Sequence, residues 1–333
     1  MYNDSVTDWF VQARDNVYNV SRQRWMDIAS SIVFLILISR GRKTWLNFLT
    51  FMTLVGGVLN AIYPSYTASW VTGNLDSVHY ELIRVLGLVT VAWCVAYFLV
   101  CKSTDETTQT SYQLSFTVVL LCHLLMFGNS LINPPKKSSV QLDHETQVSK
   151  FYGLMLWTVG TLFYTVTSKD WGGYGEQRSH ANFHLRIWFV ILLVGGCINY
   201  AMPGWAIRTA FSLDKVDSFH VLLIRSYASM LLGMALMVFR SANFLRGSDR
   251  DLLLATHLLF LVSCTICSWV SLFNKWSSLT WKLTGFQLVL HIVLFMNLFG
   301  AMDRDITVFK RVMWPRVKAI PQDIKSCFKF KQY

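Results

Sequence analysis

The chain has 333 residues, of which 53% are hydrophobic and 15% are charged, and its formal net charge is +11 at pH 7. This composition excludes an ordinary soluble protein, in which about a quarter of the residues are charged. The positive charge does not indicate nucleic-acid binding, because the sequence has no soluble basic domain that could carry it. We therefore interpret the chain as an all-α polytopic membrane protein.

The N-terminal segment, residues 1–44, precedes the first predicted span. Apolar residues recur at helical spacing between residues 10 and 20 with arginines close by, which is typical of a helix on a membrane surface. The apolar stretch 27–39 would form about 20 Å of helix, which is short for a span, and we favour a core-lying or interfacial helix. The alternative is that 27–39 spans the membrane. Asn3 and Asn19, which fit the glycosylation acceptor pattern, would then face the lumen.

Eight apolar segments follow that approach the length needed to cross a hydrocarbon core of about 30 Å. Each should be helical, because irregular backbone is not tolerated against lipid. Four belong to a first membrane unit, 45–167, and four to a second unit, 183–299, before a basic cytosolic tail, 300–333. The predicted spans cover residues 45–63, 80–101, 111–133, 151–167, 183–202, 218–240, 251–273 and 280–299.

Short sequence matches indicate that the second unit repeats the first. An even number of spans returns the chain to its starting side, so the two units must be parallel. We expect an axis along the membrane normal to relate them, as in transporters with parallel repeats. The matches are DSVHYELIR (76–84) with DSFHVLLIR (217–225), VGGVLNAIYP (55–64) with VGGCINYAMP (194–203), and CHLLMF (122–127) with THLLFL (256–261).

Lysine and arginine predict the orientation of the chain. They are concentrated on the side of residues 40–43, and eight of them lie in the tail, so this side should be cytosolic. Both termini should face the cytosol, and loops 64–79 and 203–217 should lie on the other side. The same charge predicts contact with anionic lipid headgroups at the cytosolic face. Lys329 and Lys331 resemble the dilysine retrieval signal of endoplasmic-reticulum membrane proteins, which predicts an internal membrane.

The sequence contains no nucleophile elbow, no phosphate-binding loop and no His-Glu-x-x-His motif. Cys264-x-x-Cys267 has the spacing of a redox or metal pair, but it lies in an apolar segment without a second pair. We interpret these cysteines as packing residues. No catalytic residue, metal or cofactor is predicted, and we favour a non-enzymatic protein.

Polar residues at matching positions of the two units form a candidate intramembrane site. Arg84 and Arg225 would lie about 12 Å into the bilayer, where an unpaired charge costs at least a few kcal/mol. We expect each to pair with an Asp, His or Asn of its own unit, and we expect Asp76 and Asp217 to cap their helices. The other candidates are His79 and His220, His123 and His257, and Asn60 and Asn199.

One stretch of the second unit resembles a known family. The sequence IRSYASMLLGMALMVF (224–239), preceded by an apolar helix, a proline and an aspartate, resembles the p53-inducible protein 11 family of small four-span membrane proteins. The first unit departs from this motif, because it reads IRVLG. The resemblance implies a multi-pass endomembrane protein with no established catalytic chemistry, and it assigns no functional residues.

Two hypotheses for the function follow. We favour an accessory or scaffold protein of an internal membrane, whose partners are membrane lipids and other membrane proteins. The alternative is a transporter, or a carrier of lipid or anion, with its site between the two units. A carrier needs a water-reachable cavity lined by the paired arginines and by His123 and His257, whereas in a scaffold the protein itself satisfies these groups.

Overall fold

The computed structural model describes residues 22–69, 71–100, 103, 105–133, 139–168, 171, 181–211, 213, 215–273, 281–301, 315 and 318. Apart from two short paired strands, the regular secondary structure in these ranges is helical, so the predicted all-α class is confirmed. The strands are β1 (Val71–Thr72) and β2 (Gln141–Leu142). The helices are α2 (Arg22–Ser39), α3 (Arg42–Ile62), α4 (Pro64–Ala68), α5 (Ser77–Val100), α6 (Glu106–Ile132), α7 (His144–Val166), α8 (Ala181–Ala201), α9 (Pro203–Phe211), α10 (Ser218–Ser241), α11 (Gly247–Phe273) and α12 (Trp281–Ala301).

Six of the described helices are long and apolar enough to cross a membrane, namely α3, α5, α6, α8, α10 and α11. The chain is therefore a multi-pass membrane protein. Helices α7 and α12 coincide with the predicted spans 151–167 and 280–299 but do not meet the same criterion. Helix α7 begins with the polar sequence HETQVSK, and the apolar segment described in α12, Leu288–Gly300, is too short.

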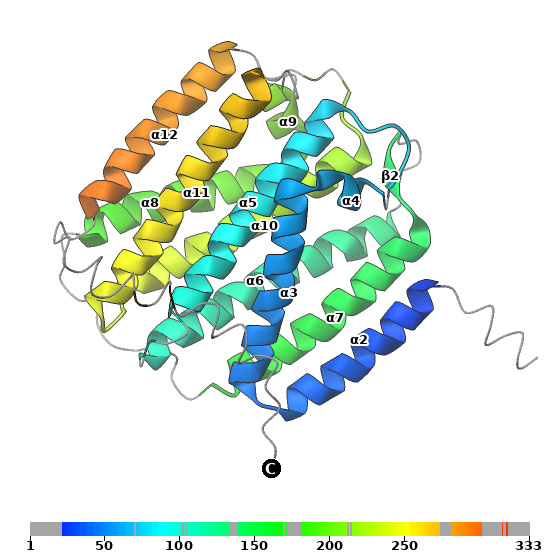
Figure 1. Cartoon of the computed structure of the whole chain (residues 1–333), viewed down its shortest axis with the longest axis horizontal. Coiled ribbons are helices and arrows are strands. Elements are labelled where there is room, and N and C mark those ends of the chain that lie inside the picture. The colour runs from blue at the N-terminus through cyan, green and yellow to red at the C-terminus, as the bar shows by residue number, and fades with distance from the viewer. Residues whose placement is uncertain are drawn as a thin grey trace, which may run out of the picture.

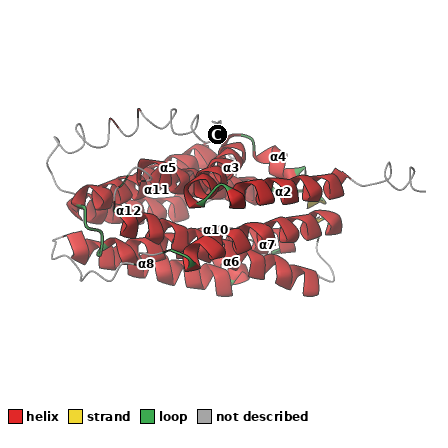
Figure 2. Cartoon of the chain, turned by 90° about the horizontal axis from the view of Figure 1, so that it is seen from below, coloured by secondary structure: helices red, strands yellow, loops and turns green. Residues whose placement is uncertain are grey.

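The long helices lie in two layers, which Figure 2 shows edge-on. One layer contains α2, α3, α5, α11 and α12, and the other contains α8, α10, α6 and α7 (Figure 1). The central helices α5 and α10 pack against each other across the layers. We call the end of the bundle that carries α4, α9 and the two strands the strand end.

Each of the two central helices packs against helices from both halves of the chain. Helix α5 packs against α3 of its own half and against α11 of the other, while α10 packs against α8 and α6. The outer pairs are α6 with α7 and α11 with α12. Each layer thus contains helices from both halves of the chain, and neither half forms a separate bundle.

Helix α2 is longer than expected and lies along the side of α7 (Figure 1). It begins at residue 22, before the predicted apolar stretch 27–39, and has 18 residues. The Ser149 hydroxyl donates to the Asp27 carboxylate at 2.5 Å, and the Tyr164 hydroxyl donates to the Ile38 carbonyl at 2.5 Å. These contacts make α2 and α7 parallel over most of their length. The predicted surface helix and both acceptor asparagines lie outside the described residues.

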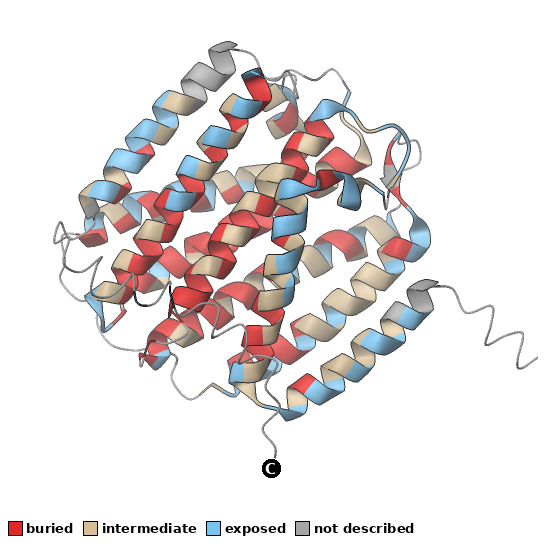
Figure 3. Ribbon diagram, viewed as in Figure 1, coloured by how far each residue is buried: buried red, intermediate tan, exposed pale blue. Residues whose placement is uncertain are grey.

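Buried and exposed apolar side chains divide the helices into a core and an outer surface (Figure 3). Large aromatic residues fill the core, and the side chains of Trp45 and Trp188 are almost completely buried. The outer faces of the peripheral helices are also apolar: Leu35 of α2 is 64% exposed and Met296 of α12 is 67% exposed. Apolar surface on this scale is typical of a membrane interface.

Glycines bring α3 and α5 into close backbone contact. A Cβ atom on Gly87 of α5 would lie 2.6 Å from the Gly57 carbonyl oxygen and 2.4 Å from the Ala61 nitrogen of α3. Small residues at such crossings allow membrane helices to approach closely. The contact fixes the position of α5, the helix that carries half of the site described next.

Candidate functional site

An Asp–His cluster lies where α5 and α10 begin side by side at the strand end of the bundle. Asp76 accepts a hydrogen bond from the His79 backbone N–H at 3.0 Å, and Asp217 accepts one from the His220 backbone N–H at 2.9 Å. Both aspartates therefore cap their helices, as predicted. This capping turn also directs each histidine ring inward, so that the two repeated Asp-Ser-x-His segments meet.

The two histidine rings stack on each other between the halves of the chain. The ring centroids of His79 and His220 lie 3.6 Å apart with an angle of 24° between the planes, and Phe219 stacks on His79 at 5.5 Å. Both histidine side chains are 1% exposed. The Asp76 side chain, in contrast, is 47% exposed, so the cluster is reached from outside the bundle at this residue.

Each carboxylate contacts both rings. An Asp76 oxygen lies 2.8 Å from His79 Nδ1 and 3.4 Å from His220 Nε2. Asp217 oxygens lie 3.2 Å from His79 Nε2 and 3.1 Å from His220 Nδ1. Burial would raise the pKa of the Asp217 carboxyl, but the contacts with His220 and His79 outweigh it and hold that pKa well below its usual value.

Arg225 is satisfied mainly by a neighbouring helix. Its Nε donates to the Tyr200 carbonyl of α8 at 3.2 Å, and the guanidinium lies 5.9 Å from the Tyr200 ring centroid. We predicted that Arg225 would pair with the side chain of an Asp, His or Asn. Its described contacts are instead a backbone carbonyl and an aromatic ring. The other side of Arg225 lines a cavity of about 330 Å³ at the strand end, together with Asn129 and Asp217.

Arg84 interacts with a buried carboxylate of its own helix that the sequence analysis did not single out. Glu81, one turn earlier in α5, is 1% exposed and interacts electrostatically with Arg84. Glu81 also accepts a hydrogen bond from the Ser271 hydroxyl of α11, and the Cys267 thiol lies 3.8 Å from it. Glu81 is covered by α11, a contact between distant segments that no local pattern signals.

The remaining candidates do not converge on the cluster. The described hydrogen bonds of these side chains are local. His123 and His257 each bond the carbonyl one turn earlier in their own helices, at 2.8 Å. Asn199 donates to the Gly195 carbonyl at 2.7 Å, and Asn60 accepts from the Thr67 hydroxyl at 2.5 Å.

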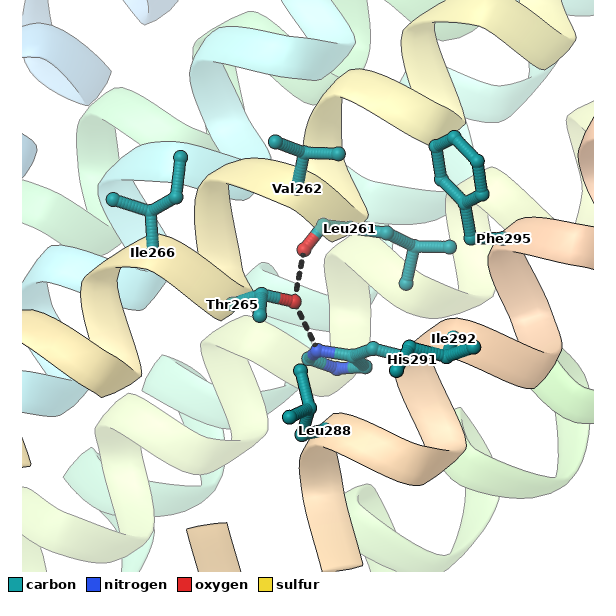
Figure 4. Close-up of a pocket in the computed structure, with 8 residues that line it drawn as sticks. All are labelled: Leu261, Val262, Thr265, Ile266, Leu288, His291, Ile292 and Phe295. Carbon is teal, nitrogen blue, oxygen red and sulfur yellow. Dashed lines mark hydrogen bonds between the residues drawn. The ribbon is translucent and has the colours of Figure 1, made fainter. Parts of the chain in front are cut away.

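The described cavities separate the candidates rather than collecting them. His123 and Asn60 line a cavity of about 430 Å³ that also contains Lys150, whereas Arg225 lines a different cavity. A third hollow, between α11 and α12, has a volume of about 200 Å³ and is almost wholly apolar. There the Thr265 hydroxyl bonds to His291 at 2.6 Å and to the Leu261 carbonyl (Figure 4).

A second polar cluster, which the sequence did not suggest, joins the two halves at the end opposite the strands. Asp105 accepts hydrogen bonds from the Thr107 N–H at 3.0 Å and from the Leu245 N–H at 2.9 Å, and the Ser103 hydroxyl donates to Asp249. These residues stand in loops and at helix starts. Lys329 and Lys331, the predicted retrieval signal, lie outside the described residues.

A family model matches residues 47–302 of the chain. The chain belongs to the family described as Domain of unknown function (DUF8292). No curated protein and no solved structure matches it. The matched segment of this DUF8292 protein contains both Asp-Ser-x-His segments and runs from α3 to the end of α12, and it leaves α2 outside.

Proposed function

We propose that the chain consists of two parallel four-helix membrane units, with α7 and α12 as the seventh and eighth spans. The pairings α3–α5, α6–α7 and α5–α11 have the counterparts α8–α10, α11–α12 and α10–α6. The repeated sequence segments lie at corresponding places in this scheme. The stacked pair of His79 and His220 then lies on the axis that relates the units.

We further propose that α2 is an additional span. Its polar residues Asp27 and Ser31 face α7, where they bond Ser149 and Tyr152, while Ile32 and Leu35 are exposed. A helix with polar residues inward and apolar residues outward matches a lipid-facing position. Its 18 residues give about 27 Å of helix, close to the thickness of the hydrocarbon core.

The function that this geometry supports best is that of a non-enzymatic accessory or scaffold protein. The observation that carries it is the direct packing of α5 against α10, which fills the axis where a carrier would need its site. Both arginines have partners within the protein, and Arg225 and His123 line different cavities, which meet at Leu222. Membrane lipids and other membrane proteins are the proposed partners.

Labelling of a native cysteine distinguishes the scaffold from a carrier. Cys94 lies in α5 and is completely buried. A carrier that alternates its access must separate the units and expose part of α5 to water, whereas a scaffold keeps Cys94 covered. We expect a membrane-impermeant maleimide to leave Cys94 unmodified in intact proteoliposomes and to modify Ser69→Cys, an exposed position. Rapid modification of Cys94 in the folded protein would favour the carrier.

A second experiment addresses the membrane topology and the location. If α2 spans, the N-terminus lies in the lumen, so Asn3 and Asn19 should be glycosylated in cells and the C-terminal tail should remain cytosolic. This proposal differs from our expectation of a cytosolic N-terminus, which the glycosylation experiment tests. Absence of glycan at both sites, with a protease-accessible N-terminal tag in sealed microsomes, would restore the interfacial helix. The endoplasmic reticulum is the proposed location because of Lys329 and Lys331, and the resemblance to the p53-inducible protein 11 family stays a prediction.

A further inference from the structure

We propose that Asp76, His79 and His220 form a binding site for a transition-metal ion of the zinc class at the junction of the two halves. The ligand atoms of these three residues lie within 4.8 Å of one another. The site goes beyond the scaffold function and does not depend on it. Two features of the cluster, one at each histidine, support this proposal.

The first feature is the Nδ1 atom of His79. The Asp76 backbone N–H donates to this nitrogen at 3.2 Å, while an Asp76 carboxylate oxygen lies 2.8 Å from the same atom. A ring nitrogen cannot accept from the N–H and also donate to the carboxylate. Nδ1 is thus either protonated and donates to the carboxylate, or it is unprotonated, and then its lone pair and the carboxylate oxygen are both available to one cation.

The second feature is the ring of His220. The side chain is 1% exposed, and neither ring nitrogen has a hydrogen-bond partner within the described part of the chain. The carboxylate oxygens of Asp217 and Asp76 lie near these nitrogens, at 3.1 and 3.4 Å, but not in hydrogen-bonding directions. Buried polar groups are normally satisfied, so a nitrogen left open toward Asp76 points to a ligand.

Asp217 lies beside the second nitrogen of each histidine, where it can orient the rings without binding the ion itself. It forms a hydrogen bond with His79 Nε2 at 3.2 Å, and it lies 3.1 Å from His220 Nδ1, where the ring must turn before its N–H points at the carboxylate. Metal-bound histidines commonly donate their second N–H to a carboxylate, which fixes the ring and raises its basicity. This arrangement leaves His79 Nδ1, His220 Nε2 and an Asp76 oxygen as the three atoms directed at the ion.

The donor set selects the class of metal. Two imidazole nitrogens and one carboxylate oxygen suit zinc and similar divalent ions, and a three-residue set leaves one position for water or an exogenous ligand. Ligand atoms on one tetrahedral zinc ion lie about 3.3 Å apart, close to the 2.8 and 3.4 Å that separate Asp76 from the two nitrogens. Binding requires the stacked rings to tilt toward each other, on the side where Asp76 is exposed.

Zinc titration of the purified protein tests the site. We use full-length protein in detergent with a histidine-free affinity tag, and we measure binding of Zn²⁺ by calorimetry and retained zinc by elemental analysis. We expect one zinc ion per chain. Asp76→Asn and His220→Ala should abolish this binding, and Asp217→Asn should weaken it about 10- to 100-fold.

The variants separate loss of a ligand from loss of the fold. Asn caps helices as well as Asp does, so Asp76→Asn removes the ligand charge and keeps the start of α5. His144→Ala, at an exposed histidine at the start of α7, is the matched control and should bind zinc like the wild type. Zinc should raise the unfolding temperature of wild type and control but not that of Asp76→Asn. Absence of zinc binding in the wild type, or wild-type affinity in Asp76→Asn, would overturn the proposal.

Discussion

Replacing Gly87 by alanine tests whether the backbone contact between α3 and α5 holds the bundle together. The added Cβ would lie 2.4 Å from the Ala61 nitrogen, 2.6 Å from the Gly57 oxygen and 2.9 Å from the Asn60 carbonyl carbon, whereas ordinary contact begins at 3.4 Å. These are backbone atoms, so no side chain can rotate away. Helix α3 must move by about 1 Å, the difference between the shortest distance and ordinary contact.

The expected cost follows from this displacement. Overpacking a well-packed core costs about 1–3 kcal/mol, and the upper end applies here because backbone has to move. The better helix propensity of alanine returns up to about 1 kcal/mol. In a chain of 333 residues, the net loss of about 2 kcal/mol should lower the unfolding temperature by about 3 °C.

Tryptophan fluorescence during heating in detergent measures this shift, with all variants scanned at one rate because unfolding of membrane proteins is commonly irreversible. Gly56→Ala is the matched control. Gly56 lies on α3, in the same pair of helices, and a Cβ at this position would meet no atom within 4 Å. Its unfolding temperature should equal or exceed that of the wild type. If Gly87→Ala unfolds at the same temperature as Gly56→Ala, the close contact does not contribute as we argue.

Three further predictions concern single sites. Arg225→Leu should lower the unfolding temperature in detergent, because the Tyr200 carbonyl loses its donor, and Arg225→Gln should recover part of the loss. Equal unfolding temperatures for the two variants would contradict a role of Arg225 in holding helices together. Ser271→Ala should destabilise the protein by about 1–3 kcal/mol, since Glu81 loses a buried donor, and thermal scans of this variant in the Glu81→Gln background should show a smaller effect. Replacing both Lys329 and Lys331 by serine should release the protein to the cell surface, as measured by surface biotinylation, whereas unchanged internal retention would contradict the retrieval signal.

Helix class and helix position were predictable because they depend on local patterns. Each of the eight predicted spans is a helix in the structure, since long apolar runs leave the backbone no other way to satisfy its hydrogen bonds in lipid. The caps at Asp76 and Asp217 were predictable for the same reason, because a cap involves residues three positions apart. The start of α2 was missed, since its first turn is polar and basic.

The candidate site was predictable only in part, because its contacts join distant segments. The repeated segments named Asp76, His79, Asp217 and His220, but nothing local indicates that the two rings stack. We expected the matching histidines and asparagines of each unit to gather around its arginine. Their described hydrogen bonds are instead made within their own helices or to a nearby residue of the chain. Glu81 illustrates the limit: its donor, Ser271, is 190 residues away on α11, and only the exchanged packing brings them together.

The exchange of helices between the halves also constrains how the protein is made. Ribosomes add about 5–20 residues per second, so Ser271 is synthesised roughly 10–40 s after Glu81. During that interval α5 lies in the membrane with an acidic side chain facing the place that α11 has yet to fill. The first half is therefore an intermediate that the insertion machinery must hold, not a finished unit, and a gene cut between α7 and α8 should yield stable protein only when both pieces are produced together.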